Sequence, residues 1–118
     1  MSKTAQNGTQ FKELQAIHDS RKSFYGKAHV RTDDNGTDWL VSYETTVACI
    51  SSGGTVLFGK DWDSSATTLR HVKEFLLQHG LPSGTKADLK HWYVDSISKR
   101  HYEQGFLRPD MDGWEGDI

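Results

Sequence analysis

The sequence predicts an α+β fold: an N-terminal helix, a three-stranded antiparallel sheet, two C-terminal helices and an acidic tail. Three patterns lead to this prediction. Between residues 24 and 59, apolar and polar residues alternate in stretches separated by glycine-containing turns, which is typical of half-buried strands. Residues 66–79 and 85–104 instead place apolar residues every three or four positions, which is typical of helices that pack on a core. This order of elements predicts helices against one face of the sheet.

Length and composition limit the class of protein. A chain of 118 residues can build one core, so we expect a single domain over residues 1–118, with residues 1–8 frayed. The net charge of −2 disfavours a dedicated nucleic-acid binder, which would be basic, but allows a local basic face. One cysteine fits a reducing compartment, and no apolar run reaches the roughly 20 residues of a membrane span. We therefore expect a cytoplasmic protein without a membrane segment.

The N-terminal helix is predicted over residues 10–22. Phe11, Leu14 and Ile17 recur every three residues and would form one narrow apolar stripe. Residues 24–32 then alternate between the two faces of a strand. The Asn-Gly pair at the end of the stretch 33–36 tolerates the positive φ of a tight turn, so a hairpin into the next strand is expected.

The second strand is predicted over residues 39–50, which are rich in β-branched and aromatic residues and contain no glycine or proline. Twelve residues is long for a strand, so we expect a bend or bulge near Glu44. The stretch 51–54 forms the next turn, and residues 55–59 return as the third strand.

Two helices follow. Asp63, Ser64 or Ser65 can cap the helix over residues 66–79, and the glycine and proline in residues 80–82 end it. Thr85 and Asp88 have the spacing of a capping box, which opens a helix that extends to about residue 104. Residues 106–118 lack periodicity and are expected to form an extended acidic tail.

The sequence offers few groups for catalysis. Cys49 lies within a predicted strand, where no local cation would form a thiolate, so we expect a packed and inert thiol. The six histidines lack the compact spacing of a zinc site. Helix capping accounts for Asp61 and Asp63 better than a two-carboxylate nuclease site does. We therefore expect no metal, no cofactor and no enzymatic activity, unless the fold brings a histidine and an acid together.

The candidates for partner binding lie at the edges of the predicted core. They are the outward pair on the first strand, the basic residues of the last helix and the acids of the tail: His29, Arg31, Lys86, Lys90, Lys99, Arg100, Asp110, Asp112, Glu115 and Asp117. Basic residues interleaved with aromatic rings can bind single-stranded nucleic acid. The simpler alternative is a helix that buries its rings and leaves its lysines in water.

Two segments resemble a small uncharacterised family found in phages, plasmids and prophages of Gram-positive bacteria. They are Ser42-Tyr-Glu-Thr-Thr-Val-Ala48 and Ser65-Ala-Thr-Thr-Leu-Arg-His-Val72, which are similar to a Ser-Tyr-x-Thr-x-Val-Ala strand and a Ser-Ala-Thr-Thr-x-x-His helix start. Leu69 stands where the pattern has a polar residue. The resemblance implies a mobile-element setting and brings no activity with it. The predicted order of elements is also similar to that of some anti-CRISPR inhibitors, a likeness of fold alone.

Three functional hypotheses follow from these observations. The first is a non-enzymatic protein that binds and inhibits or modulates a host protein, with a defence nuclease of the Cas type as the leading candidate. The second is a small nucleic-acid-binding accessory or regulatory protein. The third, an enzyme, requires a histidine–acid cluster in space.

Overall fold

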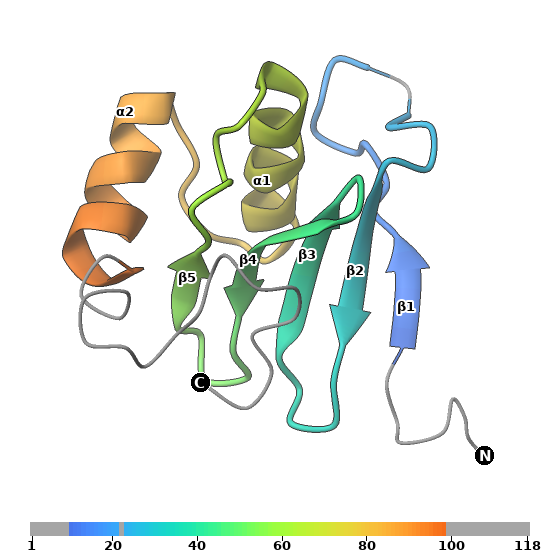
Figure 1. The fold of residues 1–118 in the computed structure, drawn as a ribbon, viewed down its shortest axis with the longest axis horizontal. Coiled ribbons are helices and arrows are strands. Elements are labelled where there is room, and N and C mark those ends of the chain that lie inside the picture. Colours follow the sequence, from blue (N-terminus) through green and yellow to red (C-terminus); the bar gives the residue numbers. More distant parts are fainter. Residues whose placement is uncertain (1–9, 22, 99–118) are drawn as a thin grey trace.

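A five-stranded antiparallel sheet forms the centre of the computed structural model, which describes residues 10–21 and 23–98 (Figure 1). The strands pair in chain order, each with the next. Their bounds are β1 Gln10–Glu13, β2 Ala28–Thr32, β3 Asp38–Ser42, β4 Thr45–Ile50 and β5 Val56–Phe58. The helices are α1 Ala66–Gln78, α2 Lys86–Leu89 and a π-helical continuation of α2, η2 Lys90–Ser98. The predicted arrangement, with three strands and an N-terminal helix, is therefore wrong.

The predicted N-terminal helix is replaced by strand β1 and an irregular loop. β1 pairs with β2, from Gln10 opposite Thr32 to Glu13 opposite His29. Only Leu14 of the expected apolar stripe is buried, whereas the side chains of Phe11 and Ile17 are 58% and 65% exposed. A stripe of three residues buries too little surface to hold a helix, and pairing with β2 satisfies the backbone instead.

The long strand predicted over residues 39–50 is a hairpin of two strands. β3 and β4 are joined by Tyr43 and Glu44, between the paired residues Ser42 and Thr45. The sequence gives no warning of this turn, because a tyrosine with a φ of 59° occupies the position that glycine or asparagine would favour. A separate register shift occurs beside Leu40 and Val41, opposite β4. The expected irregularity near Glu44 is thus a complete reversal of the chain.

The first predicted strand is shorter than its alternating pattern. Residues 24–27 form a turn in which Lys27 N donates to Phe24 O at 2.9 Å, and β2 begins only at Ala28. Tyr25 and Gly26, the two central residues, have φ values of 54° and 75°, which end the extended backbone.

One face of the sheet carries the main core. Residues from β2 to β5, with Leu14 and Phe24, pack there against the apolar face of α1 and against Leu89 of α2. A second, smaller cluster consists of Trp39, Cys49 and Leu57, which are cross-strand neighbours on β3, β4 and β5 and are all buried. The sheet therefore buries apolar side chains on both faces.

The two helices begin at the residues that the sequence indicates. Ser65 caps α1, with its Oγ accepting from Thr68 N at 3.0 Å. Thr85 and Asp88 form the expected capping box at the start of α2. The helix predicted over residues 85–104 ends beyond the described residues. The predicted acidic tail and residues 1–8 lie entirely outside them. No helix in the described part of the chain is long and apolar enough to cross a membrane.

Candidate functional site

The loop between β1 and β2 is the longest irregular segment of the described chain. We call residues 14–27 the β1–β2 loop; residue 22 lies outside the described residues. A loop of this length needs partners for its polar groups, because it forms no regular hydrogen-bond ladder. Helix α1 supplies several of them.

Three side chains of α1, spaced four residues apart, hold the first part of this loop. Glu74 is buried, and its two oxygens accept from the backbone N and the Nδ1 of His18 at 2.7 and 2.8 Å. Gln78 Nε2 donates to Glu74 Oε2 and to the carbonyl of Gln15, both at 2.7 Å. Residues four apart lie on one face of a helix, so this polar stripe runs along the loop.

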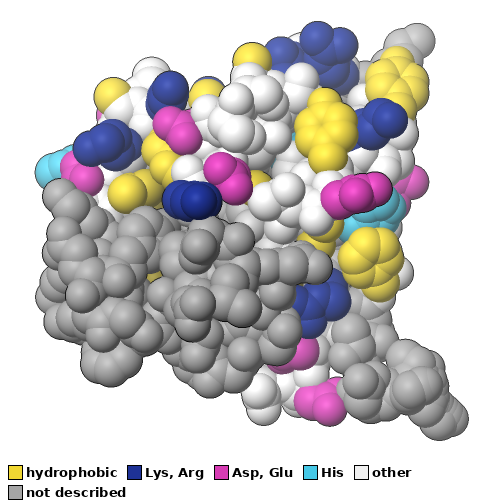
Figure 2. Space-filling view, in the orientation of Figure 1, with side chains coloured by type: hydrophobic (Ala, Val, Ile, Leu, Met, Phe, Trp, Pro, Cys, Tyr) yellow, Lys and Arg dark blue, Asp and Glu magenta, His cyan; other side chains and the backbone are white. Residues whose placement is uncertain are grey.

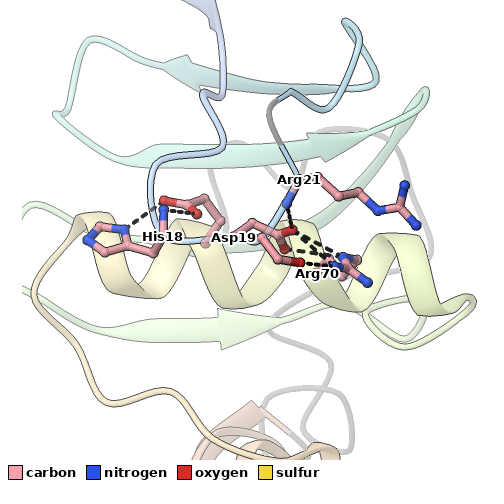
Figure 3. A network of polar contacts seen from close by, with 6 residues as sticks. His18, Asp19, Arg21 and Arg70 are labelled. Carbon is pink, nitrogen blue, oxygen red and sulfur yellow. Dashed lines mark hydrogen bonds and ion pairs between the residues drawn. The ribbon is translucent and has the colours of Figure 1, made fainter.

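Arg70 is the third member of the stripe. Its guanidinium donates to both carboxylate oxygens of Asp19, at 3.1 to 3.3 Å, and to Ser20 Oγ at 3.0 Å. The Arg21 backbone N also donates to Asp19, at 2.9 Å (Figure 3). The loop is therefore held by the ion pair between Arg70 and Asp19 as well as by the hydrogen bonds to Glu74 and Gln78.

The surroundings keep both carboxylates of this network ionised. Burial alone would raise the pKa of Asp19, but the hydrogen bonds from Arg70 and Arg21 and the charge of Arg70 leave the pKa lowered. Burial likewise opposes ionisation of Glu74, while the hydrogen bonds from Gln78 and His18 lower its pKa overall. Several hydrogen-bond donors around a carboxylate favour its anionic form and offset the cost of burial.

His18 and Glu74 are the histidine–acid contact that an enzymatic hypothesis requires. Glu74 holds Nδ1 of His18 and orients a ring whose side chain is 45% exposed. The ring borders a cleft of about 210 Å³ that Lys73, Leu77 and Ser83 also line. A carboxylate orients the histidine base of many enzymes in this way. Here Glu74 also binds the backbone of His18, which is a contact that holds the loop in place.

A second polar network lies beneath the β3–β4 turn. Ser42 Oγ is 3.0 Å from Thr68 Oγ1 and 2.8 Å from His71 Nδ1, and all three side chains are buried. Burial lowers the pKa of His71 to about 4, although the charge of Asp19 acts in the opposite direction. Among the described residues, His71 Nε2 has no hydrogen-bond partner. The ring lies instead against the rings of Phe24 and Tyr43.

This network joins the two segments that carry the family resemblance. Ser42 begins the first segment, and Thr68 and His71 belong to the second. Sequence reasoning placed these residues on a strand and a helix but did not bring them together. Ser42 and His71 have the residue types of a nucleophile and a base, but burial keeps a substrate from them.

Two tyrosines next to this network have an unusual backbone. Tyr25 and Tyr43 are the only residues other than glycine in the described chain with positive φ, at 54° and 59°. The left-handed conformation costs a residue with a Cβ about 1 kcal/mol or more. Both side chains are exposed, at 74% and 49%. Tyr43 N donates to the carbonyl of Lys27 at 2.6 Å, so the two turns are neighbours.

The predicted partner-binding pair on β2 is on the face of the sheet opposite the main core. The ring of His29 stacks on Phe11 with a centroid distance of 4.7 Å. The guanidinium of Arg31 lies 5.2 Å from the centroid of the Trp39 ring. Both side chains are half-buried. The structure thus adds Phe11, which sequence reasoning assigned to a helix, to this surface.

The predicted basic helix face is only partly described. Lys86 Nζ is 3.4 Å from Asp63, and Lys90 Nζ is 3.1 Å from Asp95, so an acid neutralises each of the two lysines. The remaining candidates lie outside the described residues: Lys99, Arg100, Asp110, Asp112, Glu115 and Asp117. The described lysines alone do not form a basic patch.

An apolar cleft was not predicted from the sequence. It has a volume of about 520 Å³ and is lined by Leu81, Pro82, Trp92, Tyr93 and the β4–β5 turn. Tyr93 OH donates to the carbonyl of Pro82 at 2.6 Å, which fixes one wall. The periodicity of residues 89–97 indicates the buried face of a helix and cannot distinguish such a cleft from a filled core.

The described residues contain no group of three histidine, cysteine or acidic side chains that could hold a metal ion. Cys49 is buried, and burial raises its pKa to about 12. A thiol in this environment remains protonated and unreactive, as the strand position suggested.

Fold and site together define a small antiparallel-sheet protein in which a helix holds a long surface loop in place. The chain belongs to a family of unknown function, DUF8033, whose match extends over residues 12–91. That range includes the β1–β2 loop, both tyrosine turns and α1. Neither the curated proteins nor the solved structures gave a match to this chain.

Proposed function

We propose that this protein acts in the cytosol by binding a host protein, without catalysis, and so inhibits or modulates a nuclease that handles nucleic acid, such as a Cas-type enzyme. The observation that carries the proposal is the β1–β2 loop. Ile17 of this loop is 65% exposed, and the loop is held in place by Arg70, Glu74 and Gln78 of α1. A held loop loses little conformational entropy when a partner binds.

The composition of the surface favours a protein partner. Figure 2 shows Lys and Arg side chains interspersed with Asp and Glu side chains over the visible part of the described surface. The exposed large apolar side chains of the described chain include Ile17, Tyr25 and Leu77. Apolar anchors with a mixed polar rim are typical of protein interfaces, whereas a nucleic-acid surface would be dominated by positive charge.

The test is complex formation between purified protein and purified Cas-type nucleases at micromolar concentration, followed by a cleavage assay. We expect a complex that slows cleavage. The variant Ile17→Asp should weaken binding at least about tenfold, because it places a charge among apolar contacts. Asn35→Asp adds the same charge at an exposed position on the β2–β3 turn, at the other end of the sheet, and is the matched control.

Two results would contradict the proposal. One is the absence of a complex with every nuclease tested at micromolar concentration. The other is equal binding by the Ile17→Asp and Asn35→Asp proteins, which would exclude the loop as the contact surface.

The stack of Phe11 on His29 favours a second candidate, a nucleic-acid-binding accessory protein. An exposed ring beside the cationic Arg31 could stack on an unpaired base. A mobility shift with single-stranded DNA or RNA at low salt would support this candidate if the affinity fell with added salt and with Phe11→Ala. Absence of a shift at low salt would exclude it.

A further inference from the structure

The small cluster of Trp39, Cys49 and Leu57 lies on the sheet face opposite α1. Leu40, the next residue on β3, belongs to the main core, and successive side chains of a strand alternate between the two faces. The three members are neighbours across β3, β4 and β5, and their exposed fractions are 1%, 0% and 0%. Such complete burial requires a covering layer, because the outer face of a single sheet is open to water.

The described elements do not supply this layer. Helices α1 and α2 pack with the main core on the other face, and η2 joins them there through Tyr93, whose ring centroid is 5.2 Å from that of Phe58. On the face of the small cluster, Asp33 Oδ2 accepts a hydrogen bond from Trp39 Nε1 at 2.9 Å, and Arg31 lies over the same ring. Both contacts are made to Trp39, so the burial of the other two members needs a further segment.

Burial is confined to one half of this face. Phe11 on β1 is 58% exposed, and the side chains of His29, Arg31 and Val41 are half-buried. The strand register places these four on the same face as Trp39. The covering segment therefore lies over the half of the sheet that ends at β5, not over the half that ends at β1.

The C-terminal part of the chain begins beside that half. Helix η2, the last described element, packs against β5 and ends at Ser98 (Figure 1). Residues 99–118 follow and lie outside the described residues. An extended chain spans about 3.3 Å per residue, so residues 99–105 can reach about 23 Å, whereas β3 is about 10 Å from β5. The C-terminal segment is therefore long enough to reach the small cluster.

Composition also favours this segment over the N-terminal one. Residues 1–9 contain no aromatic side chain and lead into β1, at the opposite edge of the sheet. Residues 99–118 contain five large apolar or aromatic side chains: Tyr102, Phe106, Leu107, Met111 and Trp114. The acids of the predicted tail also complement the charge of Arg31 at the border of the small cluster.

We propose that residues 99–118 fold back over the sheet and that Phe106 and Trp114, the aromatic residues of the acidic tail, cover the small cluster. The tail is then a second layer of the fold, and its acids lie along the sheet face that carries Arg31. This inference goes beyond the proposed function and does not depend on it.

The first arm of the test uses Cys49, the one cysteine of the chain, as a reporter within the small cluster. Its reaction with iodoacetamide at pH 8 is followed in the full-length protein. A variant with both Phe106→Ser and Trp114→Ser should react at least about tenfold faster, because a buried thiol is labelled through local opening. Tyr25→Ser, which removes a ring that is 74% exposed in the β1–β2 loop, is the control and should change the rate less than about twofold. An unchanged rate in a double variant that keeps its far-UV circular dichroism would overturn the inference.

The second arm detects the contact without removing an aromatic ring, so it also decides the case in which the double variant unfolds. The photo-cross-linking residue p-benzoylphenylalanine replaces Phe106 or Trp114 in the purified full-length protein. We expect a product with the mass of a single chain, in which the new bond is to residues 39–50 of β3 and β4. The same residue at position 5, in place of Ala5, is the control and should give no such product.

Four results of the second arm would overturn the inference. Cross-links from positions 106 and 114 to Pro82 or Trp92 would place the tail in the apolar cleft. A cross-link from position 5 to residues 39–50 would assign the cover to the N-terminal segment, and a product of twice the mass would assign it to a second copy of the chain. The absence of any product from positions 106 and 114 is the fourth. No nuclease is present in either arm, so the outcome is separate from that of the proposed function.

Discussion

Single polar residues on the inner face of α1 set how this protein responds to its environment. His71 and Glu74 are both buried, but one is neutral and the other is ionised. His71 is held neutral, with its pKa lowered to about 4 by burial, whereas Glu74 is held ionised by the donors around it. Their titrations therefore affect the free energy of unfolding in different pH windows.

The neutral form of His71 should make the protein sensitive to mild acid. Its folded pKa of about 4 is below the ordinary value of 6.5, so the stability it contributes is complete above pH 6.5 and is lost as the pH falls toward 4. The loss should be on the order of 3 kcal/mol. Urea unfolding at pH 7, 5.5 and 4.5 measures it. His71→Gln, which cannot titrate, should flatten the pH dependence over that range; an unchanged slope would contradict the assignment.

Glu74 should contribute more to stability than an exposed glutamate does. Glu74→Gln places an amide where two N–H donors of His18 require acceptors, so we expect a loss of about 2 kcal/mol at pH 7 in urea unfolding. Glu44→Gln, on the exposed β3–β4 turn, is the control and should change the free energy by less than about 0.5 kcal/mol. Because the pKa of Glu74 is lowered, its contribution should be lost only as the pH falls below the usual carboxyl range.

At the scale of elements, the segment before β2 has the sequence pattern of one element and the structure of another. A period of three over Phe11, Leu14 and Ile17 favours a helix, but the chain forms an edge strand and a loop. Only Leu14 is buried, at 3% exposure, and Leu14 N donates to the carbonyl of Ala28 at 2.9 Å. The polar groups of the β1–β2 loop form hydrogen bonds with side chains of α1 instead of a regular backbone hydrogen-bond ladder.

Shortening single side chains in this segment should therefore have unequal effects on the free energy of unfolding. Leu14→Ala should lower the free energy of unfolding by about 3 kcal/mol, since it leaves a cavity in the main core. Ile17→Ala, at a side chain that is 65% exposed, should change it by less than about 0.5 kcal/mol. Denaturant titration of both variants is the measurement. Similar losses for the two would mean that both positions face the core, as the predicted helix requires.

For the whole molecule, the central question is whether both faces of the sheet unfold together. Trp62 belongs to the main core, and Trp39 belongs to the cluster on the other face. The same strands carry both clusters, so loss of either would expose strands on which the other depends. We expect one cooperative unit, in accordance with the single domain that the chain length predicts.

Unfolding should accordingly follow a single transition. Tryptophan fluorescence, which reports on the clusters around Trp39 and Trp62, and far-UV circular dichroism should give the same midpoint in urea. Repeating the fluorescence measurement with Trp39→Phe removes the only tryptophan of the small cluster, leaves Trp62 and the tryptophans outside both clusters, and should not separate the two probes. Different midpoints would show that the small cluster unfolds independently.

Local signals were sufficient for the starts of α1 and α2 and for the buried cysteine, but they wrongly predicted an N-terminal helix. The caps at Ser65 and Thr85 are short-range chemistry and can be read from neighbouring residues. The strand count could not be obtained in this way, because Tyr43 reverses the chain without a turn residue and because the segment of β1 has the apolar spacing of a helix. The site was missed for a related reason. A spacing of four between Arg70, Glu74 and Gln78 indicates a polar stripe but not the loop that it binds.

The sequence by itself determined where α1 and α2 begin and placed Cys49 on a strand, because these features depend on near neighbours in the chain. Tertiary structure alone decided that five strands form, that the β1–β2 loop lies on α1, and that Ser42 contacts His71. Such choices are made by groups far apart in the chain, whose hydrogen bonds and buried surface outweigh local preference.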